Sequence, residues 1–177
     1  MDQMFLRSRI SGLHGLALSV FLLGGAALPA HAQIPPSAGE RASYSGLHAA
    51  AAAGDVSAIA TLVGAGADVG AKDDYGRTAL HVAAFLSHDQ AVRALVAGGA
   101  DPRALEHQKY DIVTIAAVND DVDLLKVALE LGGDARAITS PYVGTALIAA
   151  AHLGHDEVVK TLIVAGAPLD HVNNLGW

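Results

Sequence analysis

The stretch TALHVAA, at residues 78–84 of a chain of 177 residues, decides the fold. Its Leu80 has counterparts at Leu47, Val113 and Leu147, at successive spacings of 33, 33 and 34 residues. Two alanines follow each of these anchors, at the third and fourth positions after it. A glycine lies nineteen residues after each anchor, at positions 66, 99, 132 and 166. Self-similarity at a fixed period of this length is the signature of a repeat protein.

Each repeat reads as two short helices. The first begins near the anchor, and its paired alanines allow a neighbouring helix to approach closely. The second carries apolar residues at helical spacing, as in Val92, Leu95 and Val96. We expect the glycine to end the second helix, because it adopts a left-handed conformation at little cost. Hydrophobic residues make up 52% of the chain but aromatic residues only 5%, which also favours closely packed helices over a sheet.

The quoted stretch resembles the T-P-L-H-x-A-A signature of ankyrin repeats. The sequence GAD at residues 66–68 and 99–101 resembles the turn of that family, and HDEVVK at 155–160 is similar to the start of its second helix. The resemblance covers residues 44–177. It implies an all-α fold, an ankyrin-repeat solenoid of four helix-turn-helix repeats plus the start of a fifth.

Repeat three departs most from the family. Asp111 stands where threonine is usual, and Thr114 stands where histidine is usual. This difference concerns the local packing of repeat three and leaves the expected fold unchanged.

The composition of the N-terminal part and the repeats together set the expected domain boundaries. We expect a signal peptide at 1–32, a linker at 33–43 and an ankyrin-repeat domain at 44–177. Within that domain the four repeats span about 44–72, 73–105, 106–139 and 140–172, with a partial fifth repeat at 173–177. The linker is predicted to be flexible from its proline, serine and glycine content.

The N-terminus has the layout of a cleavable secretory signal. Arg7 and Arg9 precede an apolar stretch at about 16–28, and Ala30-His31-Ala32 supplies small residues before Gln33. The apolar stretch is short for a transmembrane helix, and no second run of spanning length follows. We therefore expect a periplasmic or secreted protein with no stable membrane insertion after signal cleavage.

Composition excludes several functional classes. The chain has no cysteine, which rules out a lipoprotein, disulfides and a thiol nucleophile. The formal net charge is −7 with no run of lysine and arginine, so no nucleic-acid partner is expected. No motif for a hydrolase, a zinc protease or a P-loop occurs, and we expect no cofactor and no catalytic residues.

Histidines and aspartates are the residues of this sequence for which a catalytic or metal-binding role has to be considered. The resemblance implies that His48 and His81 make structural hydrogen bonds within and between repeats. His152 and His155 have a spacing that two metal ligands on one helix can share, but Gly154 separates them at the expected turn and no third ligand follows. The cluster at Asp120, Asp121 and Asp123 starts a second helix, where acidic residues cap free N–H groups. We expect no metal site.

The remaining candidate is a binding surface. Ankyrin-type proteins bind partners through loop tips and the exposed face of the first helices, which places the following residues on the surface of this chain by position. Repeat two offers Asp74, Tyr75, Arg77, Phe85 and Leu86; repeat three offers His107, Gln108, Tyr110, Val118 and Asn119; repeat four offers Pro141, Tyr142, His152 and Leu153. Aromatic residues are enriched in binding hot spots, although Phe85 can equally pack between helices. Repeat one offers only Ala52 and Ala53 and is expected to be structural.

The function predicted from the sequence is an exported, non-enzymatic protein–protein interaction module. Resemblance to exported bacterial proteins of this kind suggests stress protection or toxin neutralisation in the periplasm of a Gram-negative bacterium. The alternative is a fragment of a larger exported enzyme or metal-binding protein whose site lies beyond Trp177. Residues 173–177 match residues 73–77 by position, and solenoids usually finish with a polar capping repeat. We therefore expect the outer face of repeat four, around Leu147, Ile148 and Leu162, to be uncovered or to dock on a partner.

Overall fold

A computed structural model describes residues 34–177, and these residues contain nine α-helices and no β-strand. The expected signal peptide at 1–32 lies outside the described residues. Within the described part of the chain, no helix is both long and apolar enough to cross a membrane. The helices are α1 (Ala38–Ser43), α2 (Gly46–Ala53), α3 (Val56–Gly64), α4 (Ala79–Phe85), α5 (Asp89–Ala97), α6 (Ile112–Val118), α7 (Val122–Glu130), α8 (Ala146–Leu153) and α9 (Asp156–Val164).

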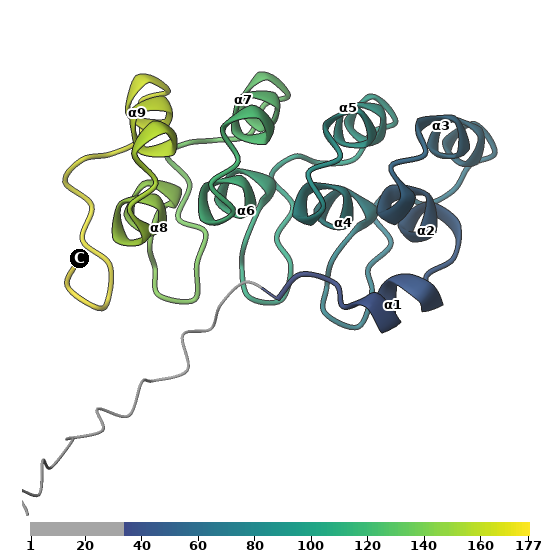
Figure 1. The fold of residues 1–177 in the computed structure, drawn as a ribbon, viewed down its shortest axis with the longest axis horizontal. Coiled ribbons are helices and arrows are strands. Elements are labelled where there is room, and N and C mark those ends of the chain that lie inside the picture. Colours follow the sequence, from purple (N-terminus) through teal and green to yellow (C-terminus); the bar gives the residue numbers. More distant parts are fainter. Residues whose placement is uncertain (1–33) are drawn as a thin grey trace, which may run out of the picture. The chain divides into compact units, whose positions relative to one another are not determined.

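The helices form two layers. The first helices of the four repeats, α2, α4, α6 and α8, pack side by side in one layer, and α3, α5, α7 and α9 form the second (Figure 1). Long loops project from the first layer on the side away from the second (Figure 1). In repeats one to three, each helix contacts the other helix of its own repeat and the equivalent helix of the next repeat. The predicted all-α solenoid of four repeats is confirmed.

The glycines predicted to end the second helices do so. The φ angles of Gly66, Gly99, Gly132 and Gly166 are 85°, 98°, 98° and 86°, which is the left-handed region. The backbone N–H of the residue after the first of these, Ala67, donates to the carbonyl of Leu62 at 3.0 Å, as expected for a helix end closed by glycine.

Repeat three begins its first helix with a different pair of residues and the same kind of cap. In repeat two, His81 Nδ1 lies 3.2 Å from the backbone nitrogen of Thr78 and 2.9 Å from its hydroxyl oxygen. In repeat three, Asp111 Oδ1 accepts from the backbone N–H of Thr114 at 2.8 Å and from its hydroxyl at 2.9 Å. The two departures from the family pattern therefore compensate each other locally.

The segment at 33–43, predicted to be a flexible linker, contains helix α1. Ser37 and Glu40 form a capping box: the N–H of Glu40 donates to Ser37 Oγ at 3.2 Å, and the N–H of Ser37 donates to Glu40 Oε2 at 2.9 Å. This S-x-x-E pattern is a helix start, which the proline and glycine content obscured. Helix α1 packs against α2 and is part of the folded unit.

The core runs through all four repeats and is built mainly from alanine, leucine, isoleucine and valine. All seven residues of α4 are buried, because this helix has neighbours on both sides. At the C-terminal end the prediction was partly wrong. Leu147 and Leu162 are buried between α8, α9 and repeat three, and Ile148 is half-buried. Most of the large apolar side chains that are exposed at the C-terminal end lie after Leu162 in the sequence.

Candidate protein-binding surface

The long loops are hairpins, and the side chain of the first residue holds each of them. Asp73 Oδ1 accepts from the backbone N–H groups of Tyr75 and Arg77, both at 2.9 Å. Asn173 Oδ1 accepts in the same way from Leu175 and Trp177, both at 3.0 Å. Glu106 and Ser140 occupy the same position in the hairpins between these two. The start of the predicted fifth repeat, 173–177, is thus a complete hairpin.

Neighbouring hairpins are joined in pairs. The backbone N–H of His107 donates to the carbonyl of Tyr75 at 3.0 Å, and that of Asn174 donates to the carbonyl of Tyr142 at 3.1 Å. At the junction between these pairs the equivalent donor position is Pro141, which has no N–H. The hairpin at 73–77 is therefore tied to that at 106–110, and the hairpin at 140–144 to that at 173–177.

The third hairpin also contains the extra residue that makes the spacing between the anchors Val113 and Leu147 34 residues instead of 33. In the first hairpin the N–H of Asp73 donates to the carbonyl of Arg77, but in the third it is Thr139, one residue before the expected Ser140, that donates to Gly144 at 3.0 Å. This hairpin is wider by one residue, and the rest of repeat four keeps its register.

Six of the sequence-predicted binding residues are exposed. These are Asp74, Tyr75, His107, Asn119, His152 and Leu153. Five more are half-buried: Leu86, Gln108, Val118, Pro141 and Tyr142. They come from three hairpins and from the C-terminal ends of α4, α6 and α8, which the repeat places next to one another.

Three predicted surface residues, Arg77, Phe85 and Tyr110, are buried, so they do not form part of an exposed surface. Phe85 packs in the core between helices, which is the alternative that the sequence left open. The Tyr110 side chain also lies in the core, and burial raises its pKa to about 12. Position within the repeat identified the loop correctly but did not show which way these side chains turn.

Arg77 is buried because its side chain binds helix α1 and the segment that precedes this helix. Its guanidinium pairs with the carboxylate of Glu40 and with Asp73 Oδ2, the latter at 2.7 Å, and donates to the carbonyl of Ile34 at 3.2 Å. It also lies 4.4 Å from the centre of the Tyr75 ring. Helix α1 was not predicted, so these partners of Arg77 were not expected.

Three exposed apolar side chains on the hairpins were not among the predicted binding residues: Leu105, Ile138 and Val143. Val143 occupies the position of Gly76 in the first hairpin, and that substitution is visible in the sequence. Ile138 lies beside the extra residue of the third hairpin, and the position of that extra residue is known only from the structure.

Comparison with protein families agrees with this architecture. A family model described as ankyrin repeats in three copies matches residues 27–106, and the model of a single ankyrin repeat matches residues 144–174. The chain contains ankyrin repeats. The matches omit most of the third repeat, where the structure shows α6 and α7 in the same arrangement as the other helix pairs. The curated proteins give no match to this sequence. Ankyrin repeats indicate a module that binds other proteins.

The histidines of the ankyrin signature are structural, as predicted. His81 is fully buried and its Nε2 donates to the carbonyl of Ala104 at 3.0 Å. Burial lowers the pKa of His81 to about 4, so the ring is neutral near pH 7. His48 Nε2 donates to the carbonyl of Arg77 at 2.9 Å, which ties the first ankyrin repeat to the hairpin of the second.

The histidines that precede the second helices of repeats two and four tie each of these repeats to the one before it. His88 lies 3.3 Å from the carbonyl of Ala52, and His155 Nδ1 lies 2.9 Å from the carbonyl of Ala117. His152 instead stacks on the ring of Trp177 with centroids 4.0 Å apart. His152 and His155 therefore do not converge on a common point.

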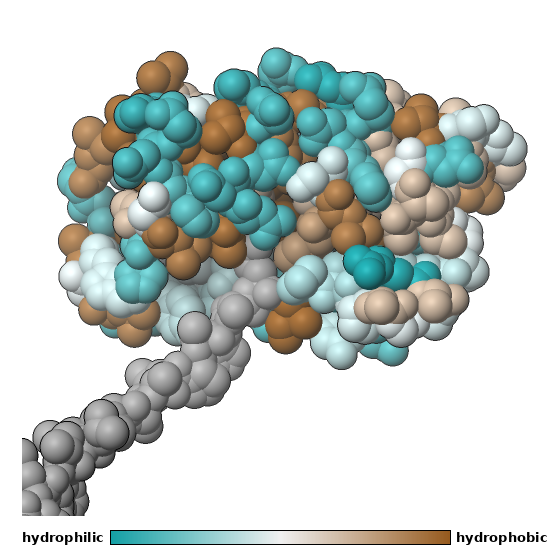
Figure 2. Space-filling model, viewed as in Figure 1, coloured by the Kyte–Doolittle hydropathy of each residue, from teal (hydrophilic) through white to brown (hydrophobic). Residues whose placement is uncertain are grey.

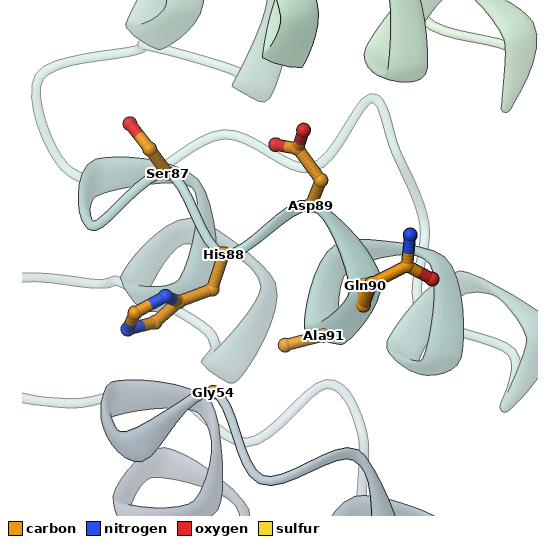
Figure 3. A pocket seen from close by; sticks show the side chains of 6 residues that line it. All are labelled: Gly54, Ser87, His88, Asp89, Gln90 and Ala91. Carbon is orange, nitrogen blue, oxygen red and sulfur yellow. The ribbon is translucent and has the colours of Figure 1, made fainter.

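A small pocket beside α5 is lined by Gly54, Ser87, His88, Asp89, Gln90 and Ala91. Figure 3 shows that its polar side chains diverge: His88 points toward Gly54, whereas Asp89 and Gln90 point away from it. Burial, together with the nearby Asp121 and Asp123, raises the pKa of Asp89. Within residues 34–177, no group of three or more His, Asp or Glu side chains is placed to hold a metal ion.

Proposed function

We propose that this chain is an exported binding module that holds a protein partner against its hairpin tips and the adjacent ends of α4, α6 and α8, and that it performs no catalysis itself. The observation that carries the proposal is the fixed row of hairpins. Each hairpin is held by its own first side chain, and backbone hydrogen bonds join the hairpins in two pairs, 73–77 with 106–110 and 140–144 with 173–177.

A preformed surface favours binding because little conformational entropy remains to be lost on association. Tyr75 is 44% exposed at a hairpin tip, and the Arg77 guanidinium lies against its ring. A large aromatic side chain held in place on a rigid loop is typical of a binding hot spot. Asn119 extends the same surface onto the end of α6.

Site-specific photo-crosslinking in cells tests this surface. We expect a benzoylphenylalanine placed at Tyr75 or at Asn119 to trap one discrete partner, identified by mass spectrometry. The matched controls are the same group at Lys126 and Thr61, which are exposed on α7 and α3 in the other helix layer. Trapping of the same partner from the control positions, or no product from Tyr75 and Asn119, would contradict the proposed surface.

Export is supported by the arrangement of Arg7, Arg9, the apolar stretch and Ala30-His31-Ala32. We expect the mature protein, tagged at its C-terminus and purified from a Gram-negative host, to begin at Gln33 and to be recovered in the periplasmic fraction. Intact-mass measurement distinguishes this from an uncleaved chain. A protein that keeps residues 1–32 would refute cleavage while leaving the binding surface untouched.

For the biological process we propose stress protection or toxin neutralisation, which rests on resemblance to exported ankyrin proteins. A deletion strain challenged with peroxide tests the first. Identification of a toxin among the crosslinked partners tests the second.

A further inference from the structure

The row of hairpins is interrupted between the hairpins at 106–110 and 140–144, and we call this point the hairpin junction. In the two joined pairs, the carbonyl of the third residue of one hairpin accepts a backbone N–H from the next hairpin. At the junction the third residue is Gln108, and the donor position is occupied by Pro141, which has no N–H. Within residues 34–177 no backbone N–H donates to the carbonyl of Gln108.

The side chain of Gln108 adds a second unsatisfied acceptor at the same place. Its Oε1 atom is buried and has no hydrogen-bond partner in the described part of the chain. A buried amide oxygen that lacks a donor destabilises the folded state, so few such atoms persist in native proteins. A single residue therefore offers two acceptor oxygens at the junction, one of the main chain and one of the side chain.

Backbone strain occurs on the same two hairpins. Lys109 and Val143 are the only residues other than glycine that have left-handed φ angles in the four hairpins, at 66° and 58°. Strained residues and unsatisfied polar groups are retained where binding or catalysis requires them, because both reduce stability. Both features meet at the hairpin junction, which marks it as a binding point.

The unsatisfied atoms of Gln108 are acceptors, so the complementary group is a donor. The guanidinium of arginine carries five N–H donors in a planar fork and no acceptor, and such a fork can reach two oxygens at once. Tyr75 and Tyr142 occupy the third position of the hairpins on either side of Gln108. Tyrosine rings stack favourably on a guanidinium, as Tyr75 already does with Arg77 at 4.4 Å.

Charge around the junction favours a cation over an anion. The hairpins at 73–77, 106–110 and 140–144 contain three carboxylates and two cationic side chains, and the whole chain has a net charge of −7. Lys109 has the same sign as an arginine, but the buried Glu106 of the same hairpin balances it. On the face shown in Figure 2, hydrophilic side chains gather over α5 and α7 in the second helix layer. A cation can also collect there, so a test has to locate the bound group residue by residue.

We propose that an arginine side chain of the partner enters the hairpin junction and donates hydrogen bonds to the main-chain carbonyl and to Oε1 of Gln108. The amide of Gln108 turns toward the guanidinium on binding, because no hydrogen bond holds its Oε1 in the unbound protein. This inference rests on the proposed function and narrows the partner surface to one point of recognition.

An NMR titration of isotope-labelled residues 31–177, which form a compact unit of their own, tests the junction. The probe is N-acetylarginine amide, and N-acetylcitrulline amide is the neutral probe of the same shape. We expect the arginine probe to shift the signals of Gln108, Lys109 and Tyr142 and to saturate in the millimolar range. The citrulline probe should bind at least about fivefold more weakly, because hydrogen bonds from a charged donor are stronger.

Three variants separate the two acceptors. Q108L removes the side-chain oxygen, and P141A supplies the missing N–H to the Gln108 carbonyl, so each should weaken binding of the arginine probe by about fivefold or more. Q108E keeps an acceptor and adds a negative charge, so it should bind this probe more tightly than the wild type. The matched control Q90L removes an exposed glutamine from α5 and should bind like the wild type.

The same spectra show whether each variant is folded. Shifts confined to the acidic side chains of α7, equal binding of the two probes, or unchanged binding by Q108L or P141A would each overturn the proposal. Crosslinking from Tyr75 and Asn119 tests the partner surface separately. A partner trapped there by a chain whose junction does not bind the arginine probe would remove this inference and leave the proposed function standing.

Discussion

The fourth position of each hairpin requires a left-handed backbone. Gly76 and Gly176 occupy it in the first and last hairpins with φ angles of 75° and 84°, but Lys109 and Val143 occupy it in the middle two, at 66° and 58°. For a β-branched residue this region is strained, because the Cβ atom crowds the backbone. The two middle hairpins therefore carry strain that the outer two avoid.

Replacing Val143 with glycine should stabilise the protein. A strained residue of this kind destabilises the folded state by about 1–3 kcal/mol. Glycine also gives the unfolded chain more conformational freedom, which offsets roughly 1 kcal/mol of the gain. We expect V143G to raise the free energy of unfolding by about 1 kcal/mol in urea denaturation. The control V143A keeps a Cβ atom and should gain much less. Equal effects of the two variants would show that the exposed valine side chain, and not its φ angle, sets the stability.

His81 should make stability depend on pH. Burial lowers the pKa of His81 to about 4, against 6.5 in an unfolded chain, so between these values the unfolded state binds a proton that the folded state excludes. The free energy of unfolding is thus highest above pH 6.5 and falls as the pH drops toward 4, by up to about 3 kcal/mol. The carboxyl groups of Glu40 and Asp73, whose pKa values hydrogen bonds hold below the usual range, add to this loss only at lower pH.

Urea titrations of the wild type and of H81Q between pH 5 and pH 7 measure this contribution. H81Q should be less stable at pH 7, because a buried hydrogen-bonded ring is lost, but its stability should change less with pH over this window. Parallel curves for the two proteins would mean that His81 takes up its proton as readily folded as unfolded.

The role of a residue that belongs to the repeat signature could be predicted from the sequence. The role of a residue that depends on a neighbour present only once in the chain could not. His81 belongs to a signature, and its role follows from its place in the repeat. Arg77 occupies the corresponding place in its hairpin, but it turns inward because Glu40, 37 residues earlier, pairs with it. That pairing requires helix α1, which has no counterpart in the other repeats and so no periodic signal.

At the scale of elements, α1 works as an N-terminal cap for the first repeat. Its only charged link to repeat two is the Glu40–Arg77 pair, and Tyr44 adds a hydrogen bond from its hydroxyl to Asp73 Oδ2 at 2.7 Å. Arg77, which also pairs with Asp73, is the least exposed cation among the described ion pairs, at 1%. Breaking a pair that leaves a buried charge costs more than breaking an exposed one.

We expect E40Q to lower the free energy of unfolding by about 1–2 kcal/mol, because Arg77 then keeps only Asp73 as a charged partner. The control E157Q breaks the fully solvated Lys160–Glu157 pair and should change stability very little. Guanidinium screens charges, so urea denaturation at low salt is the appropriate measurement. If E40Q and E157Q behave alike, α1 is not held by its ion pair.

Repeat three shows how an element can persist when its sequence signature weakens. The family models match on either side of most of this repeat, yet Asp111 and Thr114 cap α6 and the Thr114 hydroxyl bonds that of Thr139. The fold was predictable there because apolar spacing and the glycine at 132 were retained. The pairing of the hairpins was not, since it depends on the backbone N–H that Pro141 lacks.

At the scale of the whole molecule, each repeat is stabilised by its neighbours, so stability should fall toward an uncovered end. Six of seven residues are buried in α6, but only Ala146, Leu147 and Ala150 are buried among the eight of α8. Fewer buried apolar contacts mean that α8 and α9 open more readily than the repeats they follow.

Hydrogen exchange measured by mass spectrometry should resolve this gradient. We expect the amides of α8 and α9 to exchange at least about tenfold faster than those of α4 and α6, which corresponds to about 1.4 kcal/mol of local opening free energy. Uniform protection from α2 to α9 would show that the repeats unfold as a single cooperative unit despite the uncovered face.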